Sequence, residues 1–310
     1  MRQLISIVGS TATGKTDFAF QVAQNLTEKF SSVEIISADS RQVYKGMEIG
    51  TGVDLPATLP SGVHFFGTSL IKPNEEWSVA HFRNYAQQIL ELSWKKNALP
   101  ILVGGTGLYH RQVLSHDSQL MVKPNEHVRK EAEQKNVTEL QSWLQGLSAQ
   151  KLSDMNNSDK NNPRRLVRAI EIASSPQKSS SLWETEKIPH LTIGLIAPIE
   201  FLKTKIQHRI ENRLESGMIE EVEKLIVNYT EKEWAEPAFS ATGYKEVRAF
   251  LEDKLTKEQM LELWLRREVQ YAKRQMTWWK KETDIEWFDI TLSDWQKKAE
   301  QRIMLYSQHA

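Results

Sequence analysis

A glycine-rich loop close to the N-terminus limits the folds open to this chain. Residues 9–16 read Gly-Ser-Thr-Ala-Thr-Gly-Lys-Thr, which satisfies the pattern of a phosphate-binding loop: glycine, four residues, glycine, lysine, then serine or threonine. The loop follows an apolar segment at residues 3–8 that predicts a buried strand, and it precedes a helical pattern at residues 16–26. This order of strand, loop and helix predicts a parallel α/β sheet.

Each residue type in the loop suits the binding of a phosphate group. Gly9 and Gly14 let the backbone turn so that consecutive N–H groups meet phosphate oxygens at the positive end of a helix. Lys15 adds a positive charge, and the hydroxyl of Thr16 is a candidate ligand of Mg²⁺. The pattern does not define the reaction, because kinases, ATPases and diphosphate-displacing transferases all use such loops. The residues expected to bind the phosphate or diphosphate are Gly9, Ser10, Thr11, Ala12, Thr13, Gly14, Lys15 and Thr16.

Strand and helix patterns alternate along the rest of the chain, with one interruption. Residues 123–181 are polar and helical in period, which predicts a small all-helical insertion. We therefore expect a core similar to P-loop NTPases, a parallel sheet flanked by helices, from residues 1–117 and 188–310, with the helical insertion at residues 118–187. Strands are expected at residues 3–8, 33–37, 101–103, 190–195 and 286–290, and the longest helices at residues 78–96, 200–229 and 256–283.

Two predicted strands are followed by polar side chains at their carboxyl ends, where open α/β sheets bind ligands. The strand at residues 33–37 leads to Asp39, a candidate general base or metal ligand. The alternative is an aspartate that caps a helix or closes a turn. The strand at residues 101–103 runs into a glycine cluster that contains Thr106, which either reaches the ligand or caps the next helix.

Basic residues form three further groups. Arg209 and Arg213 lie one turn apart on a predicted helix, and the alternative to a role in the site is surface pairing with Glu211 or Glu215. A second group repeats at seven-residue spacing along one helix face and suits a nucleic-acid backbone, the alternative being a solvated face. This stripe consists of Arg266, Arg267, Lys273, Arg274, Lys280 and Lys281, with Tyr271, Trp278 and Trp279 as aromatic neighbours. The third group, in the insertion, is Arg164, Arg165 and Arg168, behind Pro163 at a predicted helix start.

Composition excludes several classes of function. The 310 residues hold 40 Lys and Arg against 40 Asp and Glu, and no Cys. Disulfide scaffolds, thiolate zinc sites and cysteine nucleophiles are therefore excluded, and a reducing compartment is expected. No segment approaches the roughly 18 apolar residues of a membrane-spanning helix, so we expect a soluble, cytoplasmic protein that does not bind membranes. A monomer is a separate expectation. A neutral total charge still permits one basic face.

Together these segments resemble the tRNA dimethylallyltransferase family, also called the tRNA isopentenyltransferase family. The resemblance covers nearly the whole chain, and its most specific segments are residues 39–44 and 271–278. The other segments that match are residues 9–16, 37–51, 77–82, 104–109, 165–171, 209–221 and 242–246. The chain departs from the usual family pattern at Ser10, Thr13, Gly52, Val53, His81 and Trp279. Of these departures, Gly52 and Val53 in place of Ala-Lys alter a loop near the substrate.

The resemblance implies transfer of a dimethylallyl group from dimethylallyl diphosphate to the N6 amine of adenosine 37 in the tRNA anticodon loop, with release of diphosphate. It implies that Asp39 accepts the amine proton and that Thr106 holds an adenosine extruded from the loop. Lys15, Mg²⁺ on Thr16 and an arginine from the pair Arg209 and Arg213 would neutralise the leaving group. The implied tRNA contacts are Asp39, Ser40, Arg41, Gln42, Thr106, Arg129, Arg164, Arg165, Arg168, Gly243, Tyr244, Lys245, Lys273, Arg274, Gln275, Thr277 and Lys280.

Three other functions are weighed against this one. A small-molecule kinase with the same loop explains Lys15, Thr16 and Asp39 but leaves the basic stripe and the insertion without a role. A prenyltransferase that acts on free AMP or ATP explains the donor site, whereas the long C-terminal part with its basic helix favours RNA. A non-catalytic RNA-binding protein is disfavoured, because Thr106 and Arg213 are intact together with the loop and Asp39.

Overall fold

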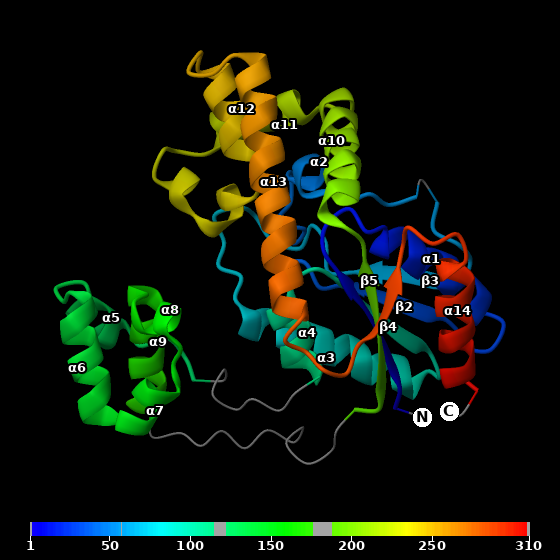
Figure 1. Cartoon of the computed structure of the whole chain (residues 1–310), viewed down its shortest axis with the longest axis horizontal. Helices are drawn as coiled ribbons and strands as arrows, with labels where there is room; N and C mark the ends of the chain where they lie inside the picture. The colour runs from blue at the N-terminus through cyan, green and yellow to red at the C-terminus, as the bar shows by residue number, and fades with distance from the viewer. Residues whose placement is uncertain (1, 57, 115–121, 176–187, 309–310) are drawn as a thin grey trace. The chain divides into compact units, whose positions relative to one another are not determined.

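The computed structural model describes residues 2–56, 58–114, 122–175 and 188–308, and the chain divides into two compact units (Figure 1). The larger unit comprises residues 1–114 and 187–310, and the smaller unit residues 115–186. The domain boundaries expected near residues 117 and 187 fall among residues outside the described ranges. Each unit has a hydrophobic core of its own.

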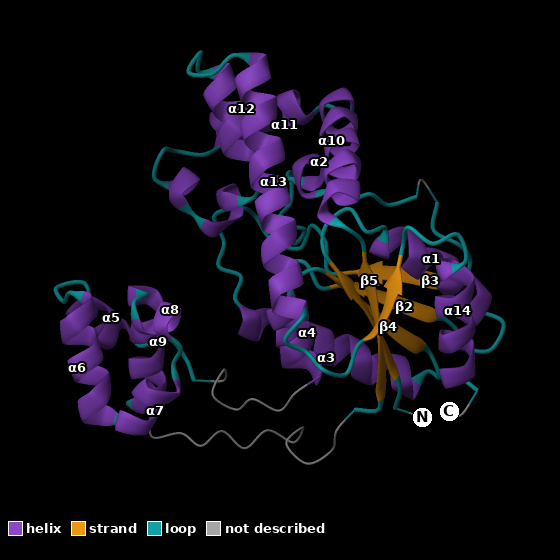
Figure 2. Ribbon diagram, viewed as in Figure 1, coloured by secondary structure: helices purple, strands orange, loops and turns teal. Residues whose placement is uncertain are grey.

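A six-stranded parallel sheet forms the centre of the larger unit (Figure 2). Its strands are β1 (Leu4–Gly9), β2 (Val33–Ser37), β3 (Val63–Phe66), β4 (Leu99–Gly104), β5 (His190–Ile196) and β6 (Glu286–Asp289), in the order β3-β2-β4-β1-β5-β6. The parallel α/β fold expected from the sequence is confirmed. The edge strand β3 was not expected, because His64 interrupts the continuous apolar run that is typical of buried parallel strands.

Helices cover both faces of the sheet. The chain passes from β1 through α1 (Lys15–Leu26) to β2 in one direction, and from β3 through α3 (Val79–Lys95) to β4 in the opposite direction. Because such crossovers are right-handed, α1 and α3 lie on opposite faces. The C-terminal α14 (Trp295–Tyr306) packs beside α1, and α4 (Gly107–Leu114) packs beside α3.

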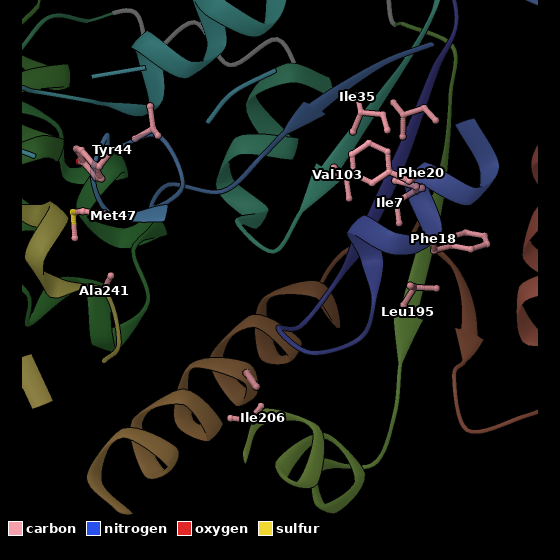
Figure 3. Close-up of a cluster of buried hydrophobic side chains, with 14 of the residues drawn as sticks. Ile7, Phe18, Phe20, Ile35, Tyr44, Met47, Val103, Leu195, Ile206 and Ala241 are labelled. Carbon is pink, nitrogen blue, oxygen red and sulfur yellow. The ribbon is translucent and has the colours of Figure 1, made fainter. Parts of the chain in front are cut away.

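The core under α1 fixes the edge of the sheet that carries the phosphate loop. Ile7, Ile35 and Val103 come from three neighbouring strands and are buried, and Phe18 and Phe20 of α1 lie close to them (Figure 3). Burial of each such side chain contributes about 1.5–3 kcal/mol. The loop between β1 and α1 is therefore held at both ends by the main core.

A helical region lies between β5 and β6 in the chain. It consists of α10 (Ile199–Glu215), α11 (Met218–Asn228), two short 3₁₀ turns (Glu233–Ala235 and Pro237–Ser240), α12 (Tyr244–Leu251) and the 23-residue α13 (Lys257–Trp279), and the short α2 (Glu48–Thr51) packs against α11. The helical pattern expected at residues 200–229 is divided between α10 and α11, because Gly217 takes a left-handed backbone (φ 99°) between them. No helix of the described chain is long and apolar enough to cross a membrane.

The smaller unit is a bundle of short helices: α5 (Glu126–Ala132), α6 (Val137–Leu147), α7 (Ala149–Asp154), α8 (Asn157–Lys160) and α9 (Pro163–Ala173). Each begins at an Asn or Ser whose side chain accepts a hydrogen bond from a backbone N–H of the first turn, which explains the many asparagines of this segment. Leu140, Leu144, Leu166 and Ile170 form its core. Pro163 occupies the first turn of α9, as expected.

Candidate active site

A cavity of about 650 Å³ opens at the carboxyl edge of the sheet in the larger unit. Segments far apart in the sequence line it: the phosphate loop, the turn after β2, the start of the loop after β4, α10, residues 240–242 and α13. The sequence-predicted site residues that line it are Thr11, Ala12, Gly14, Lys15, Thr16, Asp39, Arg41, Gln42, Arg209, Arg213, Arg274 and Gln275.

The phosphate loop is closed by its own side chains. Ala12 has a left-handed backbone (φ 64°), which is rare for a residue with a Cβ and is typical of strained functional loops. Lys15 Nζ donates to the Ser10 carbonyl oxygen (2.6 Å), and the Thr13 hydroxyl donates to the same oxygen (2.9 Å). Burial of the amine, reinforced by Arg209, lowers the pKa of Lys15 to about 7 although a carboxylate nearby acts in the opposite direction.

Asp39 follows β2 and Thr106 follows β4, at the carboxyl edge of the sheet. Asp39 Oδ1 accepts a hydrogen bond from the Arg41 N–H (2.8 Å), so Asp39 closes a turn and also lines the cavity. Thr106 Oγ1 accepts from the Ser40 N–H (3.3 Å), which joins the two segments. Thr106 is also hydrogen-bonded to Tyr271, a partly buried tyrosine of α13 that lines the cavity. Tyr271 is therefore a further candidate site residue, which the sequence analysis treated only as an aromatic neighbour of the basic stripe.

Arg209 extends from α10 to the phosphate loop. Its Nη1 donates to the Thr11 hydroxyl (2.6 Å), and its Nη2 lies 3.7 Å from the Asp54 carboxylate. Burial and the adjacent Arg213 lower the pKa of Arg209. Lys15 and Arg209 thus bring two cationic groups to one loop, an arrangement that favours an anionic ligand.

Arg213, one turn further along α10, is paired inside the protein. Its Nη1 lies 3.2 Å from Glu268 Oε1 on α13, and the two side chains are only 7% and 4% exposed. Surface pairing of this arginine with Glu211 or Glu215 is therefore wrong, because the apolar face of α10 packs against α13 and carries Arg213 with it.

Glu268 is a site residue that sequence reasoning missed. Its Oε2 accepts hydrogen bonds from the Thr242 hydroxyl (2.8 Å) and from Trp264 Nε1 (3.0 Å). Burial opposes ionisation, but the two arginines and these hydrogen bonds hold the pKa of Glu268 below its usual value. A sequence signal existed, since the buried residues of α13 follow helical spacing at Trp264, Glu268, Ala272, Gln275 and Trp279.

Two residues expected to contact RNA are hydrogen-bonded within the protein. Tyr244 is fully buried and its hydroxyl donates to the Glu221 carboxylate (2.7 Å), so the expectation of an RNA contact by this side chain is wrong. The Gln42 amide donates to the Gly52 carbonyl (2.7 Å), and its oxygen accepts from the Ser37 hydroxyl (2.7 Å). Gln42 therefore positions the loop that contains Gly52.

The basic residues of the stripe on α13 are all exposed, whereas its aromatic neighbours are not free for stacking. Trp279 is buried against His110, with ring centroids 5.3 Å apart, because α13 packs on α4. The Arg111 guanidinium covers the Trp278 ring at 4.7 Å. Both tryptophans therefore make contacts within the protein. The exposed residues of the predicted RNA set in this unit are Lys245, Lys273, Arg274, Thr277 and Lys280.

In the smaller unit the predicted RNA-binding arginines differ in their surroundings. Arg129 and Arg168 both pair with the carboxylate of Glu171, at 2.8 Å and 2.9 Å, and this carboxylate is buried. These two arginines therefore stabilise the helical bundle. Arg164 and Arg165 are exposed on α9.

The parallel sheet, the loop after its central strand and the cavity at its carboxyl edge define the class as a P-loop α/β protein. Two protein-family models match the sequence and identify a family within this class. The isopentenyl transferase model matches residues 2–66, and the IPP transferase model matches residues 42–282. The chain belongs to the IPP transferase family.

Known proteins are similar to the chain over nearly its whole length. A tRNA dimethylallyltransferase of Halothermothrix orenii is 32% identical over 304 residues, which cover 95% of this chain and 89% of that protein. The full-length tRNA isopentenylpyrophosphate transferase of Bacillus halodurans, known from a crystal structure, is 30% identical in sequence to this chain. The two structures match with a TM-score of 0.69, and the match covers 100% of this chain and 98% of that one. A eukaryotic dimethylallyltransferase solved acting on tRNA shares the fold, with a TM-score of 0.79 at 24% identity over 98% of this chain and 78% of that one. The family resemblance recognised in the sequence is confirmed.

Proposed function

We propose that this protein transfers a dimethylallyl group from dimethylallyl diphosphate to the N6 amine of adenosine 37 in tRNA and releases diphosphate. One observation carries the proposal: a single cavity joins the phosphate loop, Arg209 and Arg213 to the carboxylate of Asp39. The names of the similar proteins support the same reaction. A tRNA substrate supports a cytoplasmic location.

The donor diphosphate is assigned to the phosphate loop. Lys15, Arg209 and Arg213 supply three positive charges around one cavity, where negative charge grows on the leaving group as its C–O bond breaks. The strained backbone at Ala12 turns successive N–H groups toward the same anion. Arg209 and Arg213 already line the cavity, so little reorganisation of these two side chains opposes the reaction, whereas Lys15 exchanges its bond to the Ser10 carbonyl for the diphosphate.

The residues present fit a Mg²⁺ ion that is shared with the donor. No group of three His, Asp or Glu side chains among the residues with assigned positions could hold an ion alone. The Thr16 side chain lines the cavity next to Lys15, and Mg²⁺ usually binds through one or two protein groups, water and substrate phosphates. When bound, the ion would supply further charge neutralisation of the diphosphate.

The acceptor amine is assigned to the side of the cavity that carries Asp39. The N6 lone pair of adenine is delocalised into the ring, so its attack requires removal of a proton as the new N–C bond forms. Asp39 accepts that proton, and its turn hydrogen bond to Arg41 keeps the carboxylate fixed at the cavity wall. Thr106, held by Ser40 and Tyr271, positions the extruded base.

The RNA backbone is assigned to exposed basic residues of each unit. On α13 these are Lys273, Arg274 and Lys280, which lie on the helix that also supplies Tyr271 and Gln275 to the cavity. On the smaller unit they are Arg164 and Arg165 of α9. Neutralisation of phosphates by such side chains supplies much of the affinity for a nucleic acid.

Incubation of the protein with labelled dimethylallyl diphosphate and Mg²⁺ tests the proposal, with tRNA or AMP as the acceptor. We expect label in tRNA, recovered as N6-(dimethylallyl)adenosine after digestion to nucleosides, and no label in AMP. A matched transcript with guanosine at position 37 serves as the control and should take up no label. Labelling of AMP without labelling of tRNA would contradict the RNA substrate, and labelling of neither would contradict the reaction.

A further inference from the structure

We propose that Glu268 is a positioning residue that holds Arg213 toward the leaving diphosphate and links this arginine to the loop at Thr242. The inference rests on the proposed function, because it assigns Arg213 to the donor. Glu268 makes no bond to either substrate in this proposal. It acts through the orientation and charge of one guanidinium group.

The Arg213 guanidinium is held on one side and is free to bind on another. Nη1 pairs with Glu268, whereas Nε is buried and has no hydrogen-bond partner among the described residues. Gly52 has a φ of 70°, and a Cβ at this position would lie only 2.7 Å from Arg213 Nη2. The guanidinium is therefore confined between α13 and the loop at Gly52; Arg213 lines the cavity, and its buried Nε keeps an unused donor.

The two oxygens of Glu268 serve different parts of the site. Oε1 faces Arg213 on the donor side, and Oε2 accepts from Thr242 and Trp264. Thr242 belongs to residues 240–242, which line the cavity opposite the sheet. Because the carboxylate is saturated by these contacts, it cannot turn without breaking several hydrogen bonds.

A fixed arginine is what the chemistry requires. Charge appears on the diphosphate oxygens only as the C–O bond breaks, and a donor group that is already oriented stabilises this charge without reorganisation. The carboxylate also balances one of the three cations around the proposed anion site, which keeps a buried guanidinium charged. Glu268 should consequently affect the rate of transfer more than the binding of the donor.

The test is a double-mutant cycle between Glu268→Gln and Arg213→Gln in the full-length chain. Glutamine keeps the size of the side chain and an oxygen for Thr242 and Trp264, but it removes the charge that orients Arg213. We expect kcat to fall about tenfold or more, with the KM of the donor within about threefold of wild type. In the Arg213→Gln background the same substitution should change kcat by less than about twofold. Glu262→Gln, an exposed carboxylate on the same helix, is the matched control and should retain kcat.

Two outcomes would overturn the inference. One is a wild-type kcat in Glu268→Gln, and the other is a double variant whose fold-change in kcat equals the product of the fold-changes of the two single variants. Calorimetry measures the affinity of the same four proteins for inorganic pyrophosphate, which requires no transfer reaction. We expect the effects of the two substitutions on this affinity to be non-additive as well. If Glu268→Gln does not fold, Thr242→Val replaces it; we expect a fall of about three- to tenfold in kcat that disappears without Arg213. An unchanged kcat in folded Thr242→Val would contradict the link. A wild type that prenylates no tRNA contradicts the proposed function instead.

Discussion

Lys15 is the residue whose charge responds most directly to pH in this site. Burial and the neighbouring Arg209 bring its pKa to about 7 in the ligand-free protein, so the amine is neutral above that pH. A bound diphosphate places negative charge beside the amine and favours its protonated form. Binding therefore raises the pKa of Lys15 and takes up a proton.

The first prediction follows from this linkage. As the pH rises through 7, affinity for a diphosphate should fall by up to about tenfold per pH unit until the pKa of the bound state is reached, because each binding event must then supply a proton. Calorimetry with inorganic pyrophosphate in buffers of different ionisation enthalpy measures the proton uptake. The Lys15→Arg variant stays charged at this pH and should not take up this proton. Equal proton uptake by the variant and the wild type would therefore exclude Lys15 as the group that is protonated.

Asp39 allows a second prediction. Asp39→Asn preserves an oxygen for the Arg41 N–H and hence the turn, but it cannot accept the amine proton. We expect kcat to fall by about 10²–10⁴ while tRNA binding persists, and Asp39→Ala should fall at least as far. Single-turnover rates and a gel-shift assay with tRNA make the measurement. A kcat within about tenfold of wild type in both variants would show that Asp39 is not the base.

Residues of the site differ in how far the sequence reveals them. The phosphate loop and Asp39 could be found, because a local motif or the end of a predicted strand defines each of them. Helical spacing places Glu268 on the buried face of its helix, but its role could not be predicted, because Arg213 and Thr242 meet it only in the folded chain. Tyr244 shows the reverse case: its motif is recognisable, but the burial of its side chain is a tertiary property.

At the scale of the element, α13 has two functions on two faces. Its buried face carries Glu268 and Gln275 to the cavity, where Gln275 accepts from the Thr11 N–H (2.8 Å). Its exposed face carries the basic stripe. Periodicity in the sequence identified the helix and the stripe, whereas only packing separates the buried aromatic residues from the exposed basic ones.

The third prediction concerns that exposed face. Replacing Lys273 and Lys280 by Gln should raise the KM for tRNA and reduce the slope of log K against log salt by about two, one for each RNA phosphate that a lysine no longer neutralises. The KM for dimethylallyl diphosphate should stay within about twofold, because neither side chain lines the cavity. Lys297→Gln with Lys298→Gln on α14 is the matched control.

Thermal unfolding must accompany this experiment, because lysine stems also cover apolar surface and their loss could destabilise α13. If the folded variant keeps the wild-type KM for tRNA and the wild-type salt slope, the stripe is a solvated face. The RNA surface would then be sought on Arg164 and Arg165 of α9.

At the scale of the whole molecule, the helical insertion has a core separate from that of the sheet. The fourth prediction is that Leu144→Ala, at a fully buried position of this small core, destabilises the smaller unit by about 2–5 kcal/mol. Pyrophosphate binding by the larger unit should be unchanged, while the KM for tRNA rises. Hydrogen exchange resolved by peptide should show faster exchange in residues 126–173 alone. Equally faster exchange throughout the sheet would show that the two units unfold together.

The position of β1 in the middle of the sheet also determines when a newly made chain becomes able to bind its ligand. Gly9, at the end of β1, is in register with Leu195 of β5, and Thr11 is held by Gln275, so the loop is complete only after both partners have been synthesised. At about 5–20 residues per second, roughly 10 to 40 s separate β1 from β5 on the ribosome. The contacts of the insertion are local, so we expect it to fold within this interval. It would then fold before β1, which lies more than a hundred residues earlier in the chain, has paired with β5.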